Sequence, residues 1–226
     1  RFHAGRGIRG SCERRLRSCL SLMNKKILLI LGAVAEAAVF TIVFAKRGAD
    51  TPPVQPGPTL SMSELRPIFA LSDSDGIERS ISEWDGSALV VNFWATWCAP
   101  CRREIPLLNA LQSEYVDAGI QVIGVAVDFR EDVVAFLQEI AVNYPVLIGE
   151  QEAIDAAEAF GMDFIGLPLT AFTDHAGRVV HLHLGEVHRE QAEIVFAAIA
   201  RLRAGDMQLA AARQQISEQI QATAYR

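Results

Sequence analysis

The chain has 226 residues, with 27 acidic and 21 basic side chains, and a net charge of −6 at neutral pH. From Gly48 onward acidic residues outnumber basic ones by more than two to one, which argues against nucleic acid or an anionic lipid surface as the ligand of that part. The length allows one domain of ordinary size together with a targeting segment and tails.

Residues 27–45 form an apolar run that only Glu36 interrupts, long enough as a helix to span a bilayer. Eight Lys or Arg residues precede this run, whereas only Lys46 and Arg47 immediately follow it. The basic side of such a segment stays in the cytoplasm. We therefore predict that residues 1–26 are cytoplasmic, that 27–45 are a transmembrane signal-anchor in the inner membrane of a bacterium, and that the rest faces the periplasm.

Two alternatives concern this first segment. Val43-Phe44-Ala45 offers a small-residue cleavage pattern, although the length of the run and the basic flank favour retention of the anchor. Met23 with Lys25 and Lys26 has the form of a bacterial export signal's start, which would leave residues 1–22, with Cys12 and Cys19, untranslated.

Residues 46–60 contain Pro52, Pro53, Pro56 and Pro58. Prolines fix the backbone and lack a hydrogen-bond donor, so this stretch is expected to be an extended, semi-rigid linker. It leads to a domain that we place at residues 61–203.

The clearest secondary-structure pattern of the domain starts at Ala88. The run from there to Ala95 is apolar and rich in β-branched residues, which predicts a strand covered on both faces. Helical spacing after Cys101 continues to Gly119, and a second buried strand follows, which completes a β-α-β unit. The hydrophobic pattern and turn residues predict the remaining elements: helices at 131–141, 151–160 and 188–203, an extended piece at 144–148, and strands at 169–173 and 178–184 around the loop 174–177. This order predicts an α/β fold with a mixed central sheet flanked by helices.

Cys98 and Cys101 lie between the first of these strands and the following helix, at the edge where open α/β sheets place their sites. Free N–H groups and the helix dipole favour a thiolate at Cys98. Cys101 is nearly one turn further on, within bonding distance, and Pro100 suits a first-turn position. The pair can therefore form and break a disulfide.

Three other uses of the cysteines were weighed. Structural zinc needs four ligands, and the exported part holds no second cysteine pair. A purely structural disulfide across so small a loop would constrain the unfolded chain little. A peroxide-reducing thiol is a closer alternative, but it would need a peroxide-binding pocket, which the motif does not indicate.

The segment Ala95-Thr96-Trp97-Cys98-Ala99-Pro100-Cys101, its preceding strand and Gly166-Leu167-Pro168-Leu169-Thr170 resemble the thioredoxin superfamily, and within it the membrane-anchored TlpA/ResA-like thiol-disulfide oxidoreductases. The resemblance covers about residues 65–203. It implies a thioredoxin-like fold in which Cys98 and Cys101 are catalytic.

The resemblance also assigns further residues. Pro168 matches the cis-proline of the family, and Leu167 before it would pair with a substrate strand through its backbone. Trp97, Ala99 and Pro100 would also contact substrate.

Two positions bear on proton transfer. Asn92 stands where thioredoxin has a buried aspartate, so the proton of Cys101 needs another acceptor. Glu104 matches the acidic residue of this branch, and its spacing of three from Cys101 makes it the candidate.

The implied function is disulfide exchange on exported proteins, with no cofactor beyond the Cys98–Cys101 pair and no metal. The branch usually acts as a reductase in cytochrome c maturation or copper-centre assembly, which makes apocytochrome c or copper-site proteins the expected substrates and a membrane thiol carrier the expected reductant. The alternative is a Cu(I)-binding assembly factor that uses the same dithiol with a histidine from His181, His183 or His188.

Residues 204–226 lie outside the resemblance. Leu209, Ile216 and Ile220 among Gln and Ala indicate a weakly amphipathic helix. We interpret it as a C-terminal extension that the domain does not need.

Overall fold

The computed structural model describes residues 62–223. The predicted cytoplasmic segment 1–26, signal-anchor 27–45 and linker 46–60 lie outside the described residues. Among residues 62–223 no helix combines the length and the apolar character that a membrane crossing requires.

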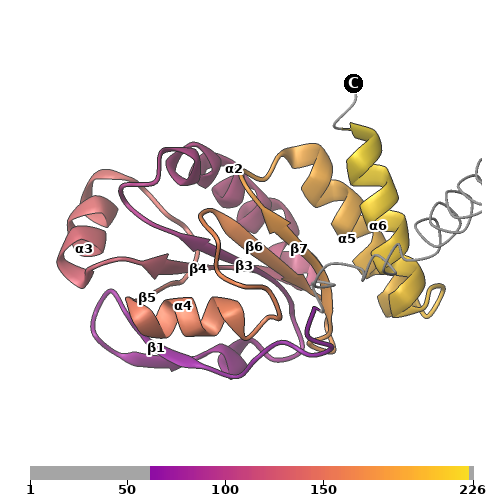
Figure 1. The fold of residues 1–226 in the computed structure, drawn as a ribbon, viewed down its shortest axis with the longest axis horizontal. Helices are drawn as coiled ribbons and strands as arrows, with labels where there is room; N and C mark the ends of the chain where they lie inside the picture. The colour runs from indigo at the N-terminus through magenta and orange to yellow at the C-terminus, as the bar shows by residue number, and fades with distance from the viewer. Residues whose placement is uncertain (1–61, 224–226) are drawn as a thin grey trace, which may run out of the picture. The chain divides into compact units, whose positions relative to one another are not determined.

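Strands and helices alternate through most of the described chain (Figure 1). The strands are β1 (Ala70–Asp73), β2 (Glu78–Ser80), β3 (Ala88–Trp94), β4 (Ile120–Val127), β5 (Val146–Gly149), β6 (Leu169–Thr173) and β7 (Val179–Leu184). The helices are α2 (Ala99–Tyr115), α3 (Arg130–Glu139), α4 (Gln151–Glu158), α5 (Arg189–Ala204) and α6 (Leu209–Thr223), with 3-10 turns η1 (Ile81–Trp84) and η2 (Val116–Ala118).

All seven strands form one sheet in the order β2-β1-β5-β4-β3-β6-β7. The central strands β3, β4 and β5 run parallel, whereas β1, β2, β6 and β7 pair antiparallel to their neighbours. Every residue of β3 is buried, which explains why this strand is apolar without alternation. The predicted mixed sheet is confirmed.

Alternate residues of β3 pack into two cores, one on each face of the sheet. Val90 and Trp94 join a core that contains residues of α2, α5 and α6, while Val91 and Phe93 join a second core with η1 and α4. Figure 1 shows α2 and α4 on opposite sides of the sheet. The helices therefore flank both faces, as predicted, and the carboxyl ends of β3 and β4 meet at one edge.

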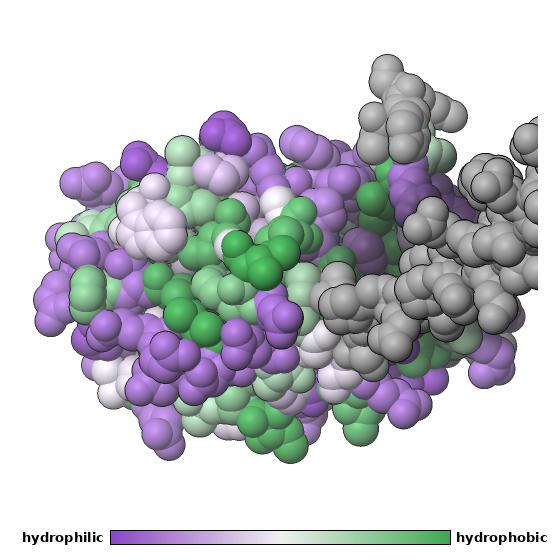
Figure 2. Space-filling model, in the orientation of Figure 1, coloured by the Kyte–Doolittle hydropathy of each residue, from purple (hydrophilic) through white to green (hydrophobic). Residues whose placement is uncertain are grey.

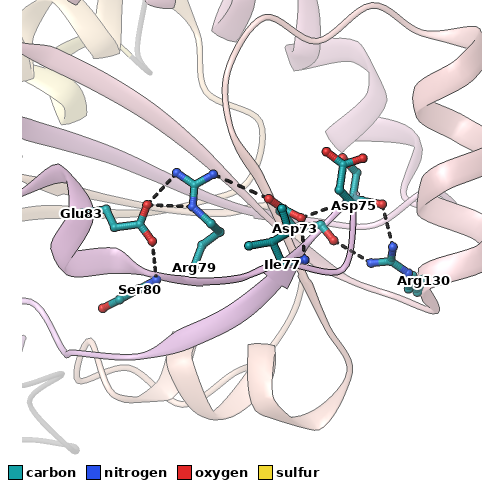
Figure 3. Close-up of polar contacts among 8 residues, drawn as sticks. Asp73, Asp75, Ile77, Arg79, Ser80, Glu83 and Arg130 are labelled. Carbon is teal, nitrogen blue, oxygen red and sulfur yellow. Dashed lines mark hydrogen bonds and ion pairs between the residues drawn. The ribbon is translucent and has the colours of Figure 1, made fainter.

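The hairpin of β1 and β2 was not predicted, because these strands are short and mostly polar. Asp73 ends β1, and its side chain accepts the backbone N–H groups of Asp75 and Ile77 at 2.9 and 3.0 Å. Arg130, at the start of α3, donates to the carbonyl oxygens of Asp73 and Ser74 at 2.6 and 2.7 Å. Figure 3 shows the Asp73 and Arg130 contacts, so the turn is attached to the start of α3.

Helix α6 packs against the domain instead of extending from it. Its Ala212 and Ile216 are fully buried in the same core as α5, and Arg213 donates through Nη2 to the carbonyl oxygen of Val179 at 2.6 Å. The expectation that residues 204–226 are dispensable does not fit this packing.

Candidate active site

The dithiol lies at the junction of β3 and α2. Cys98 is the residue that caps α2, and its sulfur accepts the backbone N–H of Cys101 at 3.3 Å. The two cysteines form a disulfide, with their Cα atoms 5.3 Å apart. Cys98 is 5% exposed and Cys101 is completely buried, so Cys98 is the cysteine nearer to the surface.

The residues predicted to contact substrate occupy the surface around Cys98. Trp97 is 70% exposed, Ala99 is exposed, and Pro100 lies in the first turn of α2. On the other side of the edge, Leu167 is half-buried, and the peptide bond between Leu167 and Pro168 is cis.

Strand pairing brings these two segments together. Leu169, the residue after Pro168, pairs with Phe93 of β3 in the antiparallel register of β3 and β6. Pro168 and the dithiol therefore share one edge of the sheet. Their roles in catalysis stay predictions.

Glu104 is buried one helical turn beyond Cys101. Its Oε1 accepts the side-chain amide of Asn92 at 2.8 Å, and its Oε2 accepts the backbone N–H of Val187 at 2.8 Å. Burial raises the pKa of Glu104 to about 7, because loss of hydration outweighs the two hydrogen bonds, and the charge of Glu186 raises it further. Glu104 can therefore take up or release a proton near neutral pH.

Asn92 links Glu104 to the sheet. The amide nitrogen that donates to Glu104 also donates to Oγ1 of Thr170 in β6 at 2.9 Å. Because Asn92 cannot ionise, the carboxyl of Glu104 is the titratable group of this cluster. The arrangement agrees with the proton role predicted for Glu104 and does not by itself establish it.

Asp128 is a site residue that the sequence analysis missed. Its Oδ2 accepts both the backbone N–H and the hydroxyl of Thr96, at 2.9 and 2.6 Å, and its Oδ1 accepts the N–H of Phe129 at 2.9 Å. These bonds attach the loop before Cys98 to the end of β4. An acidic residue directly after a buried parallel strand was the signal that could have found it.

Trp94 forms part of the core under the dithiol. It is 2% exposed, and its ring centroid lies 5.3 Å from that of Phe136. A Cβ atom at Gly124 would lie 3.1 Å from Trp94 Nε1 and 3.1 Å from a ring carbon of Tyr144, so a larger residue there would require both rings to shift by a few tenths of an ångström. Burial, with the charge of Glu104, raises the pKa of Tyr144.

The histidines proposed for the copper alternative do not form a metal site. His181 is enclosed beside Phe172, and burial lowers its pKa to about 4. His183 also has a lowered pKa because of burial, whereas His188 is exposed at the start of α5. Across residues 62–223 no group of three His, Cys, Asp or Glu side chains could hold a metal ion, so the copper alternative gains no support there.

Comparisons with known proteins relate the chain to thiol-disulfide oxidoreductases. The AhpC/TSA family matches residues 63–182. The chain is 29% identical to the thiol-disulfide oxidoreductase ResA of Geobacillus kaustophilus, over 76% of this chain and 91% of that protein. It is 32% identical to the thioredoxin-like protein YneN of Bacillus subtilis, over 56% of this chain and 74% of that protein.

A solved structure extends the likeness to three dimensions. The thiol:disulfide interchange protein, thioredoxin family protein, from Chlorobium tepidum TLS superposes with a TM-score of 0.52 at 29% identity. The match covers 62% of this chain and 94% of that chain.

Proposed function

Because this chain belongs to the AhpC/TSA family and is a TlpA/ResA-like thiol-disulfide oxidoreductase of the thioredoxin superfamily, we propose that it reduces disulfides of exported proteins. The observation that carries the proposal is the Cys98–Cys101 disulfide at the start of α2, with Glu104 buried one turn beyond it. The ResA relatives and the disulfide interchange protein support the same chemistry.

The proposed reaction has two exchange steps. The Cys98 thiolate attacks one sulfur of the substrate disulfide, and the other substrate sulfur leaves as a thiolate. Cys101 then attacks Cys98 in the mixed disulfide and releases the second substrate thiolate. The substrate gains two electrons and, with two protons from the site and solvent, ends as a dithiol, while the Cys98–Cys101 pair ends as a disulfide.

The unequal exposure of the two cysteines supports this order of events. Cys98 has the small exposed fraction through which a substrate sulfur can approach, whereas Cys101 is completely buried. The helix N-terminus also stabilises a thiolate at Cys98. Glu104, whose pKa burial raises to about 7, is the acceptor proposed for the proton of Cys101.

We further propose that the chain is anchored by residues 27–45 and acts in the periplasm at the inner membrane. A membrane thiol carrier would return the oxidised pair to the dithiol. By analogy with ResA-like relatives, the substrates would be apocytochrome c or copper-site proteins, and no metal or organic cofactor would take part.

The test is to trap substrates with Cys101→Ser. Without Cys101 the mixed disulfide on Cys98 cannot be resolved, so it should accumulate in cells and release its partners on reduction, for identification by mass spectrometry. The Cys98→Ser variant is the control and should trap none of these partners. Equal trapping by both variants, or a purified wild-type protein that reduces no protein disulfide, would contradict the proposal.

A further inference from the structure

Three large apolar side chains remain exposed at the edge of the sheet that holds the dithiol. Trp97 is 70% exposed, Phe129 57% and Ile165 71%. Trp97 precedes Cys98, Phe129 follows the end of β4, and Ile165 lies in the loop before Pro168. Figure 2 shows apolar surface gathered in the middle of one face of the molecule and surrounded by hydrophilic residues.

A pocket of about 340 Å³ lies between Trp97 and the start of α4. Trp97, Val127, Phe129 and Ile154 supply its apolar wall, and Asp128 and Glu150 add two carboxylates. The pocket therefore combines aromatic surface with negative charge directly beside the residue that precedes Cys98.

The two carboxylates differ in what they can still bind. Asp128 is buried and already accepts hydrogen bonds from Thr96 and Phe129. Glu150 is exposed, and its side chain makes no capping hydrogen bond to α4. Glu150 is therefore the acidic group that is free to meet a charged ligand.

The surroundings of the pocket strengthen its negative character. Exposed acidic residues stand in the first turns of both neighbouring helices, Glu131 and Asp132 in α3 and Glu152 in α4. The basic residue closest in sequence, Arg130, donates instead to the carbonyl oxygens of Asp73 and Ser74 (Figure 3). On α2, Arg103 pairs with Glu186, and Arg102 lies over the ring of Phe136.

We propose that this pocket binds a Lys or Arg side chain of the substrate polypeptide close to its reactive disulfide. The methylene groups of that side chain would pack on Trp97 and Phe129, and its charged end would lie over an aromatic ring and near Glu150. A purely apolar side chain would fit worse, because it would remove water from carboxylates without replacing it. The inference rests on the proposed function, since it names which disulfide substrates this site prefers.

Disulfide-bonded peptides that differ only at one position beside the reactive cysteine provide the test. With Lys, Gln or Glu at that position, kcat/KM of the full-length protein should fall in that order. The Lys peptide should exceed the Gln peptide by about three- to tenfold, as expected for an exposed ion pair combined with a cation–π contact. Added salt should reduce this ratio.

Variants at Glu150 and Glu152 distinguish binding in the pocket from general electrostatic attraction. Glu150→Gln should bring the ratio between the Lys and Gln peptides close to one, and Glu150→Lys should reverse the preference in favour of the Glu peptide. Glu152→Gln also removes one negative charge, two residues further on in the first turn of α4 and outside the pocket wall, so this variant should retain most of the ratio.

Failure of this inference can be distinguished from failure of the proposed function. If the wild-type protein reduces all three peptides equally well, or if Glu150→Gln and Glu152→Gln change the ratio equally, the pocket does not select a cation. If no peptide is reduced, the reductase proposal fails. Binding of non-reducible thioether peptides, followed by tryptophan fluorescence, then still decides whether the Lys peptide is preferred over the Glu peptide.

Discussion

Glu104 in α2 and Val187 before α5 are joined by a 2.8 Å hydrogen bond from the backbone N–H of Val187 to Oε2 of Glu104. The bond connects the helix that starts at the dithiol with a segment far along the chain. Both residues are buried, so the carboxyl group is held within the protein instead of moving in solvent.

Glu104→Gln should slow disulfide reduction by about 10²- to 10⁴-fold, the usual contribution of a positioned acid or base. In the wild-type protein the resolving step should become faster as pH rises through about 7, because only the ionised carboxyl accepts the proton of Cys101. The variant should lack this rise. Single-turnover reduction of a disulfide peptide between pH 5 and 9 measures both effects.

Glu114→Gln is the matched control for that measurement, since Glu114 lies on the same helix but at the surface, paired with Arg189. It should leave the rate and the pH profile unchanged. A Glu104→Gln protein with the wild-type profile would remove the proton role from Glu104.

Glu104 should also make stability depend on pH. Burial in the folded protein raises the pKa of this carboxyl from its ordinary value of 4.5 to about 7, so folding favours the protonated form. The protonated carboxyl of Glu104 contributes roughly 3 kcal/mol to the free energy of unfolding, relative to the ionised form. This stabilisation is fully present below about pH 4.5 and is lost as pH rises through 7. At pH 8 the oxidised Glu104→Gln protein should therefore have a larger free energy of unfolding than the wild type.

Denaturant unfolding at pH 5 and pH 8 tests this expectation. The quantity to compare is the difference in free energy of unfolding between the wild type and Glu104→Gln. Burial lowers the pKa of His181 to about 4, so the stability of both proteins falls towards low pH, and this shared effect cancels in the difference. A difference that stays constant between pH 5 and pH 8 would contradict the raised pKa.

Asp128→Ala should loosen the loop that carries Trp97 and Cys98. The substitution leaves the two partly buried donors of Thr96 without their acceptor, so we expect a loss of about 1–3 kcal/mol in stability and slower disulfide exchange. Thr96→Val should give part of both effects, because the backbone N–H of Thr96 keeps its bond. Asp132→Asn, at an exposed position in α3, is the control. If Asp128→Ala leaves the stability unchanged, the hydrogen bonds from Thr96 to Asp128 contribute nothing to it.

Ile216→Ala should destabilise the protein by about 2–4 kcal/mol, the usual cost of truncating a buried Ile. Ile216 is completely buried although it lies in α6. Gln219→Ala changes an exposed position of the same helix and should have little effect. Equal thermal midpoints for the two variants would show that the domain does not depend on α6.

The predicted topology is tested with fusions of alkaline phosphatase after Pro58. The excess of basic residues before residue 27 should keep that side in the cytoplasm, so the enzyme should reach the periplasm and be active, and membranes should retain the protein. An inactive fusion would contradict export. An active fusion that is wholly soluble would indicate cleavage near Ala45.

The sequence predicted the central part of the fold because β3, β4 and their connecting helix carry strong patterns. The apolar runs match strands buried on both faces, and Gly119 ends the segment with a positive φ of 79°. The hairpin of β1 and β2 escaped prediction because its strands have few apolar residues and depend on contacts with Arg130 and β5. The packing of helix α6 against the domain was not predicted, because a weakly amphipathic pattern does not reveal what covers its apolar side.

The candidate site followed the same division. Cys98, Cys101 and Glu104 were found because they lie within one short motif, where helical spacing relates them. The partners of Glu104 and Thr96 were not found, because Val187 and Asp128 reach the site through tertiary packing. Local patterns therefore pointed to the candidate reactive groups, whose roles stay predictions, but not to the groups that hold them in place.

The donor and acceptor roles in the hydrogen bond between Asn92 and Glu104 depend on whether Glu104 is protonated. An ionised Glu104 only accepts, and it receives the amide N–H of Asn92. A protonated Glu104 must donate, and the amide of Asn92 can meet this by turning over to present its oxygen, while the hydroxyl of Thr170 turns from acceptor to donor. An aspartate at position 92 would instead add a second negative charge beside an ionised Glu104. The neutral amide of Asn92 can therefore donate to the ionised carboxyl group and accept from the protonated one.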